Sequence, residues 1–177
     1  MSNDFKRLNR TLVREGHILT YYEDTIALPD GRTVVYDLIH HKGAAAVVAV
    51  TEEGKLLMVT QYRNALDRYT LELPAGGRDY HEEPTIDCAR RELEEETGYR
   101  CGRITKLLSL KSTVAFCDEL IDVYLATDLT PTAQHLDDDE FINVSEHTIE
   151  ELLAKIHSFE IQDAKTVAGI LAYAAML

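Results

Sequence analysis

The stretch RRELEEETGY, residues 90–99, places four glutamates within little more than one helical turn. Like charges three or four residues apart on a helix repel each other by roughly 0.2–0.5 kcal/mol per pair, and no lysine follows to offset them. The spacing predicts that Glu92, Glu95 and Glu96 share one side of a helix, whereas Glu94 faces elsewhere. Two interpretations are open: a solvated acidic helix face, or a set of oxygen ligands for a hard divalent cation.

The residues around this stretch predict a helix from Pro84 to Thr97. Proline suits the first turn, apolar residues recur at helical spacing, and Gly98 suits the C-cap position. The preceding segment LPAGG, residues 73–77, consists mostly of small residues. Because these residues leave the backbone accessible, one of its carbonyl groups can approach a cation held by the glutamates.

The composition limits what the chain can bind. With 177 residues, 45% of them hydrophobic, it is expected to form one domain with a sizeable core. The net charge of −13 argues against binding to nucleic acid or to an anionic membrane, so an anionic substrate would need a local cation. The chain has no apolar run long enough to span a bilayer, and its first residues lack the apolar core of a signal peptide. We therefore expect a cytoplasmic protein.

Apolar and alternating segments on both sides of the helix predict β-strands. Segments 17–28 and 32–41 flank a turn at residues 29–31, so residues 1–41 are expected to form a small N-terminal β-hairpin subdomain. Helical patterns return at residues 147–157 and from residue 163 to the end. The other expected strands are 44–50, 55–63, 70–73, 103–110, 120–127 and 141–144. Many strands with few helices predict an α+β fold in which helices pack on a mixed sheet.

The glutamate cluster also belongs to a longer pattern. Gly77, Glu83 and the run Arg91–Tyr99 match G-x5-E-x7-R-E-U-x-E-E-x-G-U, where U is a bulky apolar residue, at every fixed position. This segment resembles the Nudix box. The stretches QYR, LELPAGG and IQDAKT resemble the ADP-ribose pyrophosphatase branch of the Nudix hydrolases, whose members hydrolyse nucleoside diphosphate sugars. The resemblance implies a Nudix fold over residues 42–177, an α/β/α sandwich around a mixed sheet, and a homodimer formed through residues 1–41.

The resemblance also implies roles for single residues. Glu92 and Glu96 would be direct ligands of Mg²⁺ or Mn²⁺. Glu95 would serve both metal binding and catalysis, shared between ions or acting through water, and the carbonyl of Ala75 would complete the ligand set. The structural positions of the box would be Gly77, Glu83, Arg91 and Gly98, with Glu83 and Arg91 paired to hold the loop.

Substrate contacts and the general base follow from the same resemblance. Arg63 would bind the substrate diphosphate, although a surface strand residue is the alternative, and Glu119 would contact the ribose on the sugar side. The base would come from the acidic loop LDDDEF, residues 136–141, in which Glu140 is favoured because it has the longest side chain and adjoins a strand. For Asp137 and Asp138, a solvated loop is the preferred interpretation.

The sequence departs from the branch at residues 113–116. Many ADP-ribose enzymes have Ser-Pro-Gly there, and this chain has TVAF, which leaves the preferred sugar nucleotide open. The expected activity is therefore metal-dependent hydrolysis of nucleoside diphosphate sugars. The alternatives are a sensing module that binds a nucleotide sugar without cleaving it, and Nudix enzymes that act on oxidised nucleoside triphosphates or on coenzyme A.

Overall fold

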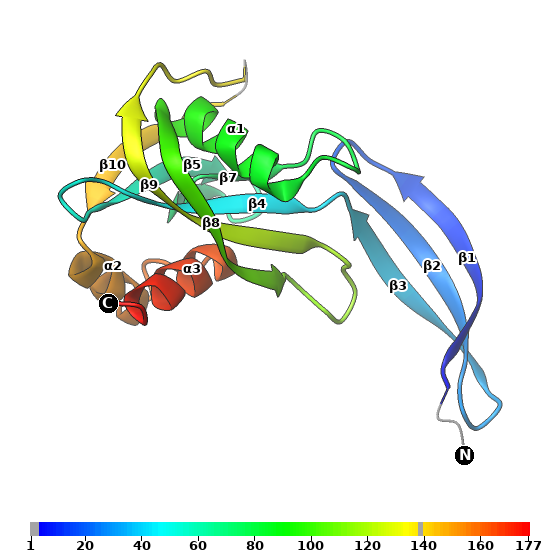
Figure 1. Ribbon diagram of the computed structural model, residues 1–177. Coiled ribbons are helices and arrows are strands. Elements are labelled where there is room, and N and C mark those ends of the chain that lie inside the picture. The colour runs from blue at the N-terminus through cyan, green and yellow to red at the C-terminus, as the bar shows by residue number, and fades with distance from the viewer. Residues whose placement is uncertain (1–3, 138–139) are drawn as a thin grey trace. The chain divides into compact units, whose positions relative to one another are not determined.

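The computed structural model describes residues 4–137 and 140–177, and these divide into two compact units (Figure 1). Unit 1 comprises residues up to 43 together with residues 111–120, and unit 2 comprises residues 44–110 and 121–177. The sequence led us to expect an N-terminal subdomain of residues 1–41 alone. The grouping differs because unit 1 also includes a segment from much later in the chain.

Unit 1 is built on an antiparallel sheet with the order β1-β2-β3, formed by β1 (Lys6–Glu15), β2 (Leu19–Ala27) and β3 (Thr33–His41). The expected two-stranded hairpin is therefore corrected to three strands. All ten residues of β1 are exposed, so this strand carries no alternation between buried and solvated positions that would identify it in the sequence. The later segment joins β3 through two backbone bonds, in which Ile39 donates to Phe116 (2.7 Å) and Asp118 donates to Ile39 (3.1 Å).

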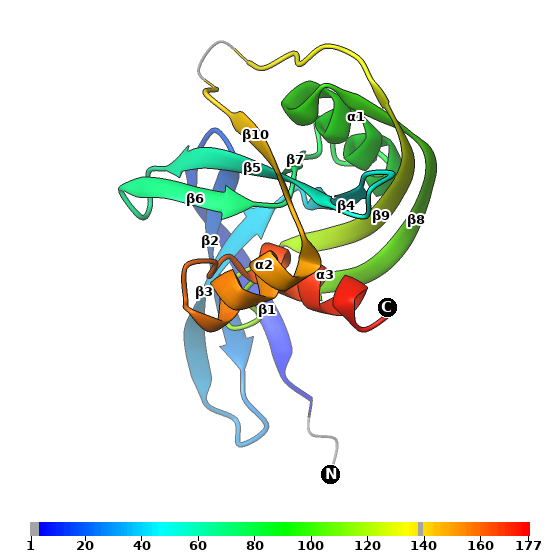
Figure 2. The same cartoon turned by 90° about the vertical axis from the view of Figure 1, so that its left-hand side faces the viewer.

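Unit 2 contains a mixed sheet with the order β10-β5-β4-β9-β8, to which β6 and β7 add by pairing with β5 and β4. Strands β4 and β9 run parallel, whereas β4 and β5 run antiparallel. The predicted α+β fold with a mixed sheet is thus confirmed. Its elements are β4 (Ala44–Val50), β5 (Leu56–Arg63), β6 (Arg68–Glu72), β7 (Ala75–Gly77), α1 (Thr85–Thr97), β8 (Tyr99–Lys111), β9 (Leu120–Pro131), β10 (Asn143–His147), α2 (Ile149–His157) and α3 (Ala164–Ala174). Strands β6 and β10 both pair with β5 in the antiparallel sense (Figure 2). Among the described residues, no helix is long and apolar enough to cross a membrane.

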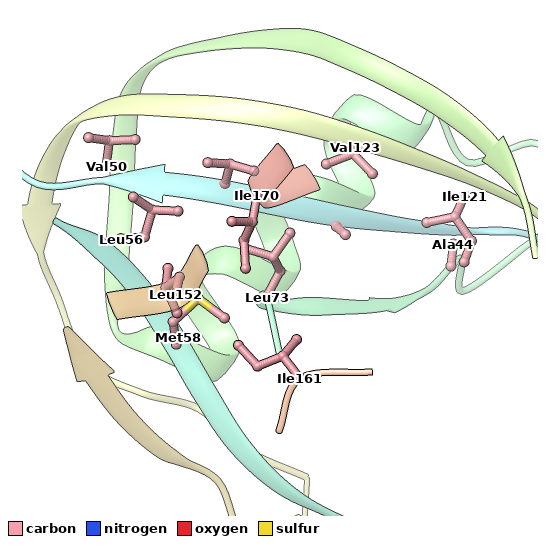
Figure 3. Close-up of a cluster of buried hydrophobic side chains, with 12 residues drawn as sticks. Ala44, Val50, Leu56, Met58, Leu73, Ile121, Val123, Leu152, Ile161 and Ile170 are labelled. Atoms are coloured by element: carbon pink, nitrogen blue, oxygen red, sulfur yellow. The ribbon is translucent and has the colours of Figure 1, made fainter. Parts of the chain in front are cut away.

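Strand β4 lies at the centre of the core because every one of its seven residues is buried. Its side chains alternate between the two faces of the sheet. On one face Val50 lies in a cluster with Leu152 of α2 and Ile170 of α3 (Figure 3). On the other face Val47 packs with Leu93 of α1. Helices thus cover both faces of the sheet (Figure 1), which accounts for the continuous apolar run at residues 44–50.

The helix ends explain where α1 and α2 begin and stop. Pro84 is the N-cap of α1 instead of a residue of its first turn, and Gly98 ends the helix in the left-handed conformation at φ 71°. A capping box starts α2, in which Thr148 and Glu151 satisfy each other's backbone N–H groups. The strand expected at 141–144 begins two residues later as β10, and Phe141 is exposed.

Candidate functional site

Two carboxylates of α1 pack against strand β7, of which Glu96 is buried and Glu92 is partly buried. The Glu96 residue is only 2% exposed, and one of its carboxylate oxygens accepts a hydrogen bond from the backbone N–H of Ala75 at 2.8 Å. The Glu92 carboxylate lies against the backbone of Gly76, because a Cβ added there would be 2.1 Å from the carboxylate carbon. A side chain at position 76 would therefore displace Glu92. Strand β7, part of the expected LPAGG loop, thus fixes both carboxylates by its backbone.

Burial makes these two carboxylates hard to ionise. Burial is the main cause that raises the pKa of Glu96 to about 8, and the negative charges of Glu92 and Glu140 add to it. Burial likewise raises the pKa of Glu92 to about 7, where Arg91 opposes the shift and Glu95 and Glu140 add to it. When both carboxylates are ionised, the nearby cations therefore compensate their negative charge only in part.

Arg91 ties the loop before α1 to the acidic side of the helix. Its Nη1 donates to Glu92 at 2.7 Å and to Glu95 at 3.0 Å, and its Nη2 donates to the carbonyl of Gly77 at 2.9 Å. The Arg91 guanidinium also reaches the buried Glu83 at 3.4 Å. These carboxylates raise the pKa of Arg91 against the effect of its burial. Arg91 thus remains charged while it contacts three of the acidic groups.

Glu83 holds the loop that leads into α1. One of its carboxylate oxygens accepts a hydrogen bond from the backbone N–H of Asp79 at 2.8 Å, and its backbone carbonyl accepts one from Nε of Arg78 at 2.7 Å. The Glu83 residue is 5% exposed. Glu83 therefore joins Arg78 and Asp79 of the loop to Arg91 of α1.

The acidic side chains of the site are not arranged around a single metal position in this structure. Within residues 4–137 and 140–177, no three acidic, histidine or cysteine side chains are close enough together to hold a metal ion. Glu94, on the same helix, instead accepts a hydrogen bond from Arg100 at 2.7 Å. Glu92 and Glu95 accept hydrogen bonds from Arg91, and Glu96 accepts one from the backbone N–H of Ala75.

The loop that carries Glu140 is fastened to the C-terminal end of α1. The backbone N–H of His135 donates to the carbonyl of Glu95 at 2.9 Å, and Nε2 of Gln134 donates to the carbonyl of Glu96 at 2.6 Å. Since the last carbonyls of a helix have no partner within it, the loop caps the helix. The charge of Glu140 acts on both Glu92 and Glu96, so the predicted base belongs to the same electrostatic site. Asp138 and Asp139, also in this loop, lie outside the described residues.

Arg63, the predicted diphosphate ligand, is held by a buried carboxylate. Its Nε and Nη2 each donate to Glu72 at 2.7 Å. The ammonium group of Lys165, at the start of α3, reaches the same carboxylate. The charge of Glu96 also acts on Arg63. Sequence reasoning did not identify Glu72, Lys165 or Gln134, although the first two lie within the quoted stretches LELPAGG and IQDAKT.

Two sequence features of interest belong to unit 1. The Glu119 carboxylate lies 3.3 Å from Nδ1 of His41, and its assignment to the substrate ribose stays a prediction. The TVAF segment contributes Val114, Ala115 and Phe116 to the lining of a cavity of about 490 Å³ within unit 1. The segment that departs from the ADP-ribose pattern thus borders an open space, where a change of side chain alters the shape of that space.

Comparison with known proteins gives a consistent result. The family model for the NUDIX domain matches residues 40–169. An ADP-ribose pyrophosphatase of Bacillus subtilis (strain 168) is 40% identical over 167 residues, which cover 93% of this chain and 90% of the relative. A methanol dehydrogenase activator of Bacillus methanolicus is 38% identical with the same coverage. The crystal structure of an ADP compounds hydrolase superimposes with a TM-score of 0.86 at 20% identity, covering 98% of this chain and 94% of that one, and shows the same fold.

Proposed function

Because this chain belongs to the NUDIX family and is a Nudix hydrolase, we propose that it hydrolyses the diphosphate bond of nucleoside diphosphate sugars, ADP-ribose among them. The products are a nucleoside monophosphate and a sugar phosphate. The observation that carries the proposal is the buried Glu96 with the partly buried Glu92 beside it: the charge of Glu140 acts on both carboxylates, and the charge of Arg63 acts on Glu96. The name of the 40% identical relative supports ADP-ribose as a substrate.

The chemistry of the α1 carboxylates fits a divalent cation. The carboxylates of Glu92 and Glu96, whose pKa values are raised to about 7 and about 8, repel each other when both are ionised, and a hard cation with oxygen ligands relieves that repulsion. We assign Mg²⁺ or Mn²⁺ to Glu92, Glu95, Glu96 and the carbonyl oxygen of Ala75. When bound, the cation supplies positive charge for the diphosphate and lowers the pKa of water.

The remaining roles fall to side chains of the chain itself. Arg63 binds the diphosphate through charge-assisted hydrogen bonds. Glu140 accepts a proton from the attacking water as the water oxygen bonds to phosphorus. The bond between that phosphorus and the bridging oxygen breaks, and its electron pair leaves with the second phosphate. Glu140 then carries the proton, which it returns to solvent before the next turnover.

The proposed reaction is tested by identifying products. We expect ADP-ribose to give AMP and ribose 5-phosphate in the presence of Mg²⁺ or Mn²⁺. Because TVAF replaces the proline-bearing segment, we also expect turnover of ADP-glucose, GDP-mannose or UDP-glucose, with only a modest preference for ADP-ribose. Chromatography of each reaction measures this. Inorganic phosphate or pyrophosphate as the first product would contradict the reaction, and binding without turnover would favour a sensing module.

We further propose that the chain forms a homodimer through the sheet of unit 1. The support is its exposed apolar side chains, since Leu12 is 54% exposed and Val35 is 59% exposed, and three-stranded sheets need a packed face to be stable. Sedimentation equilibrium at micromolar concentration should give twice the chain mass of 20.0 kDa, and Leu12→Arg should shift the protein towards monomer. A wild-type species of 20.0 kDa would contradict the dimer.

A further inference from the structure

The Glu72 carboxylate receives three different donors at the edge of the site. Besides Arg63, these are the hydroxyl of Thr70 at 2.6 Å and the ammonium group of Lys165. Lys165 also donates to Asp163 at 2.9 Å. Burial alone would raise the pKa of Glu72, but Arg63, Lys165 and Thr70 lower it to about 2. Glu72 is therefore a permanent negative charge shared between two cations.

The exposure of the three charged side chains follows a gradient. The side chain of Arg63 is 39% exposed, that of Lys165 is 11% exposed and that of Glu72 is 3% exposed. Arg63 is thus the member that a dissolved anion can reach, while Glu72 and Lys165 are shielded from solvent.

The position of Lys165 is unfavourable for the helix that carries it. Asp163 is the N-cap of α3 and its carboxylate accepts the N–H of Thr166, so Lys165 lies in the first turn. The helix macrodipole favours anions at this end and disfavours cations. The N-cap Asp163 stabilises the helix start. The ammonium group of Lys165 is therefore better explained by its contact with Glu72 than by helix stability.

When a carboxylate binds an arginine through two parallel hydrogen bonds, it cancels much of the positive charge of that arginine. Because Lys165 binds the Oε2 atom that Arg63 also contacts, it offsets part of the negative charge of Glu72. We propose that Lys165 is a positioning residue that acts through Glu72, fixing the Arg63 guanidinium and preserving its net positive charge for the phosphates of an anionic substrate. The inference rests on the proposed function only in that Arg63 is the group that meets the diphosphate.

The test compares Lys165→Met and Lys165→Arg with a matched control, Lys155→Met. Lys155 lies on α2 and pairs with Glu160, so its loss removes a lysine–glutamate ion pair that does not involve Glu72. We expect Lys165→Met to raise the KM for ADP-ribose about tenfold with a smaller change in kcat. Lys165→Arg should stay near wild type because it keeps the charge. Calorimetric titration with inorganic pyrophosphate in EDTA should show the same order of affinities without any turnover.

A double-mutant cycle separates positioning from mere packing. If Lys165 acts through Glu72, adding Glu72→Gln to Lys165→Met should recover much of the lost affinity for pyrophosphate, because no excess negative charge then opposes Arg63. The cycle also stays informative if Lys165→Met is poorly folded in thermal melts, since the double variant balances the buried charges. Equal KM and pyrophosphate affinity for Lys165→Met and Lys155→Met would overturn the inference and leave the hydrolase function intact. A wild-type protein that binds neither ADP-ribose nor pyrophosphate would overturn both.

Discussion

Replacing Glu96 with glutamine should reduce turnover of ADP-ribose by about three orders of magnitude, because loss of a metal ligand removes several kcal/mol of charge stabilisation and each 1.4 kcal/mol is tenfold in rate. Glu92→Gln should behave in the same way. The fold should survive in both variants, since glutamine keeps the size of the side chain and can accept the hydrogen bond that Ala75 donates to Glu96. Steady-state kinetics with saturating Mg²⁺ measure the effect.

The same variant makes a prediction about stability in EDTA. The folded protein raises the pKa of Glu96 to about 8 from 4.5, so between those values it retains a proton that the unfolded chain has released. The contribution of Glu96 to wild-type stability therefore falls as pH rises through this window, and this contribution is constant below the window and above it. The glutamine of the variant has no proton to lose. Glu96→Gln should thus melt close to wild type at pH 4.5 and progressively higher than wild type towards pH 8.

Glu94→Gln is the matched control for both measurements. Glu94 lies on the same helix but pairs with Arg100, away from the buried carboxylates. Its replacement should leave kcat near wild type. It should also leave the pH dependence of the melting temperature close to that of the wild type. Near-normal activity of Glu96→Gln in Mg²⁺ would rule out the metal assignment, whatever the melting curves show.

Glu140→Gln should lower kcat by about 10² to 10⁴, the usual contribution of general base catalysis, while KM changes little. A group that accepts a proton in the transition state acts on the rate of the chemical step and not on ground-state binding. The side chain lies in the loop fastened to α1, where its charge acts on Glu92 and Glu96. Steady-state kinetics with saturating Mg²⁺ measure the effect.

Asp137→Asn provides the comparison within the same loop. Asp137 is exposed, and it contacts Glu140 through its own backbone atoms, since the N–H of Glu140 donates to the carbonyl of Asp137 at 3.0 Å. The substitution should therefore keep kcat close to wild type. An unchanged kcat in Glu140→Gln would move the role of base to another group.

Much of the fold could be predicted because strong local patterns agree with tertiary burial. Strand β4 is apolar on both faces and is buried on both faces, and α1 is bounded by Pro84 and Gly98. Strand β1 was not predicted because all of its residues are exposed. Its sequence therefore carries no alternation between buried and solvated positions. Strand β7 is three residues long, and its pairing with β4 depends on a neighbour distant in the chain that no local pattern records.

The candidate site could likewise be predicted only in part. Glu92, Glu95 and Glu96 could be identified because helical spacing places them on one side of α1. Glu72 and Lys165 are 93 residues apart, and their contact exists only once α3 packs beside the end of β6. Gln134 likewise acquires its role from the carbonyl of Glu96. Side chains that support a site from distant elements leave no spacing signal in one sequence.

The two-segment construction of unit 1 has a consequence for how the chain is synthesised. Strand β3 bonds to residues 116 and 118 through Ile39, yet residues 44–110, which belong to unit 2, are made in between. During synthesis, residues 44–110 of unit 2 are therefore made before the sheet of unit 1 can gain its last segment. During that interval the backbone groups of Ile39 remain unpaired at a strand edge, the kind of surface on which nascent chains associate wrongly. The order of synthesis therefore differs from the order of contacts in the sheet of unit 1, whose last segment is made after residues 44–110.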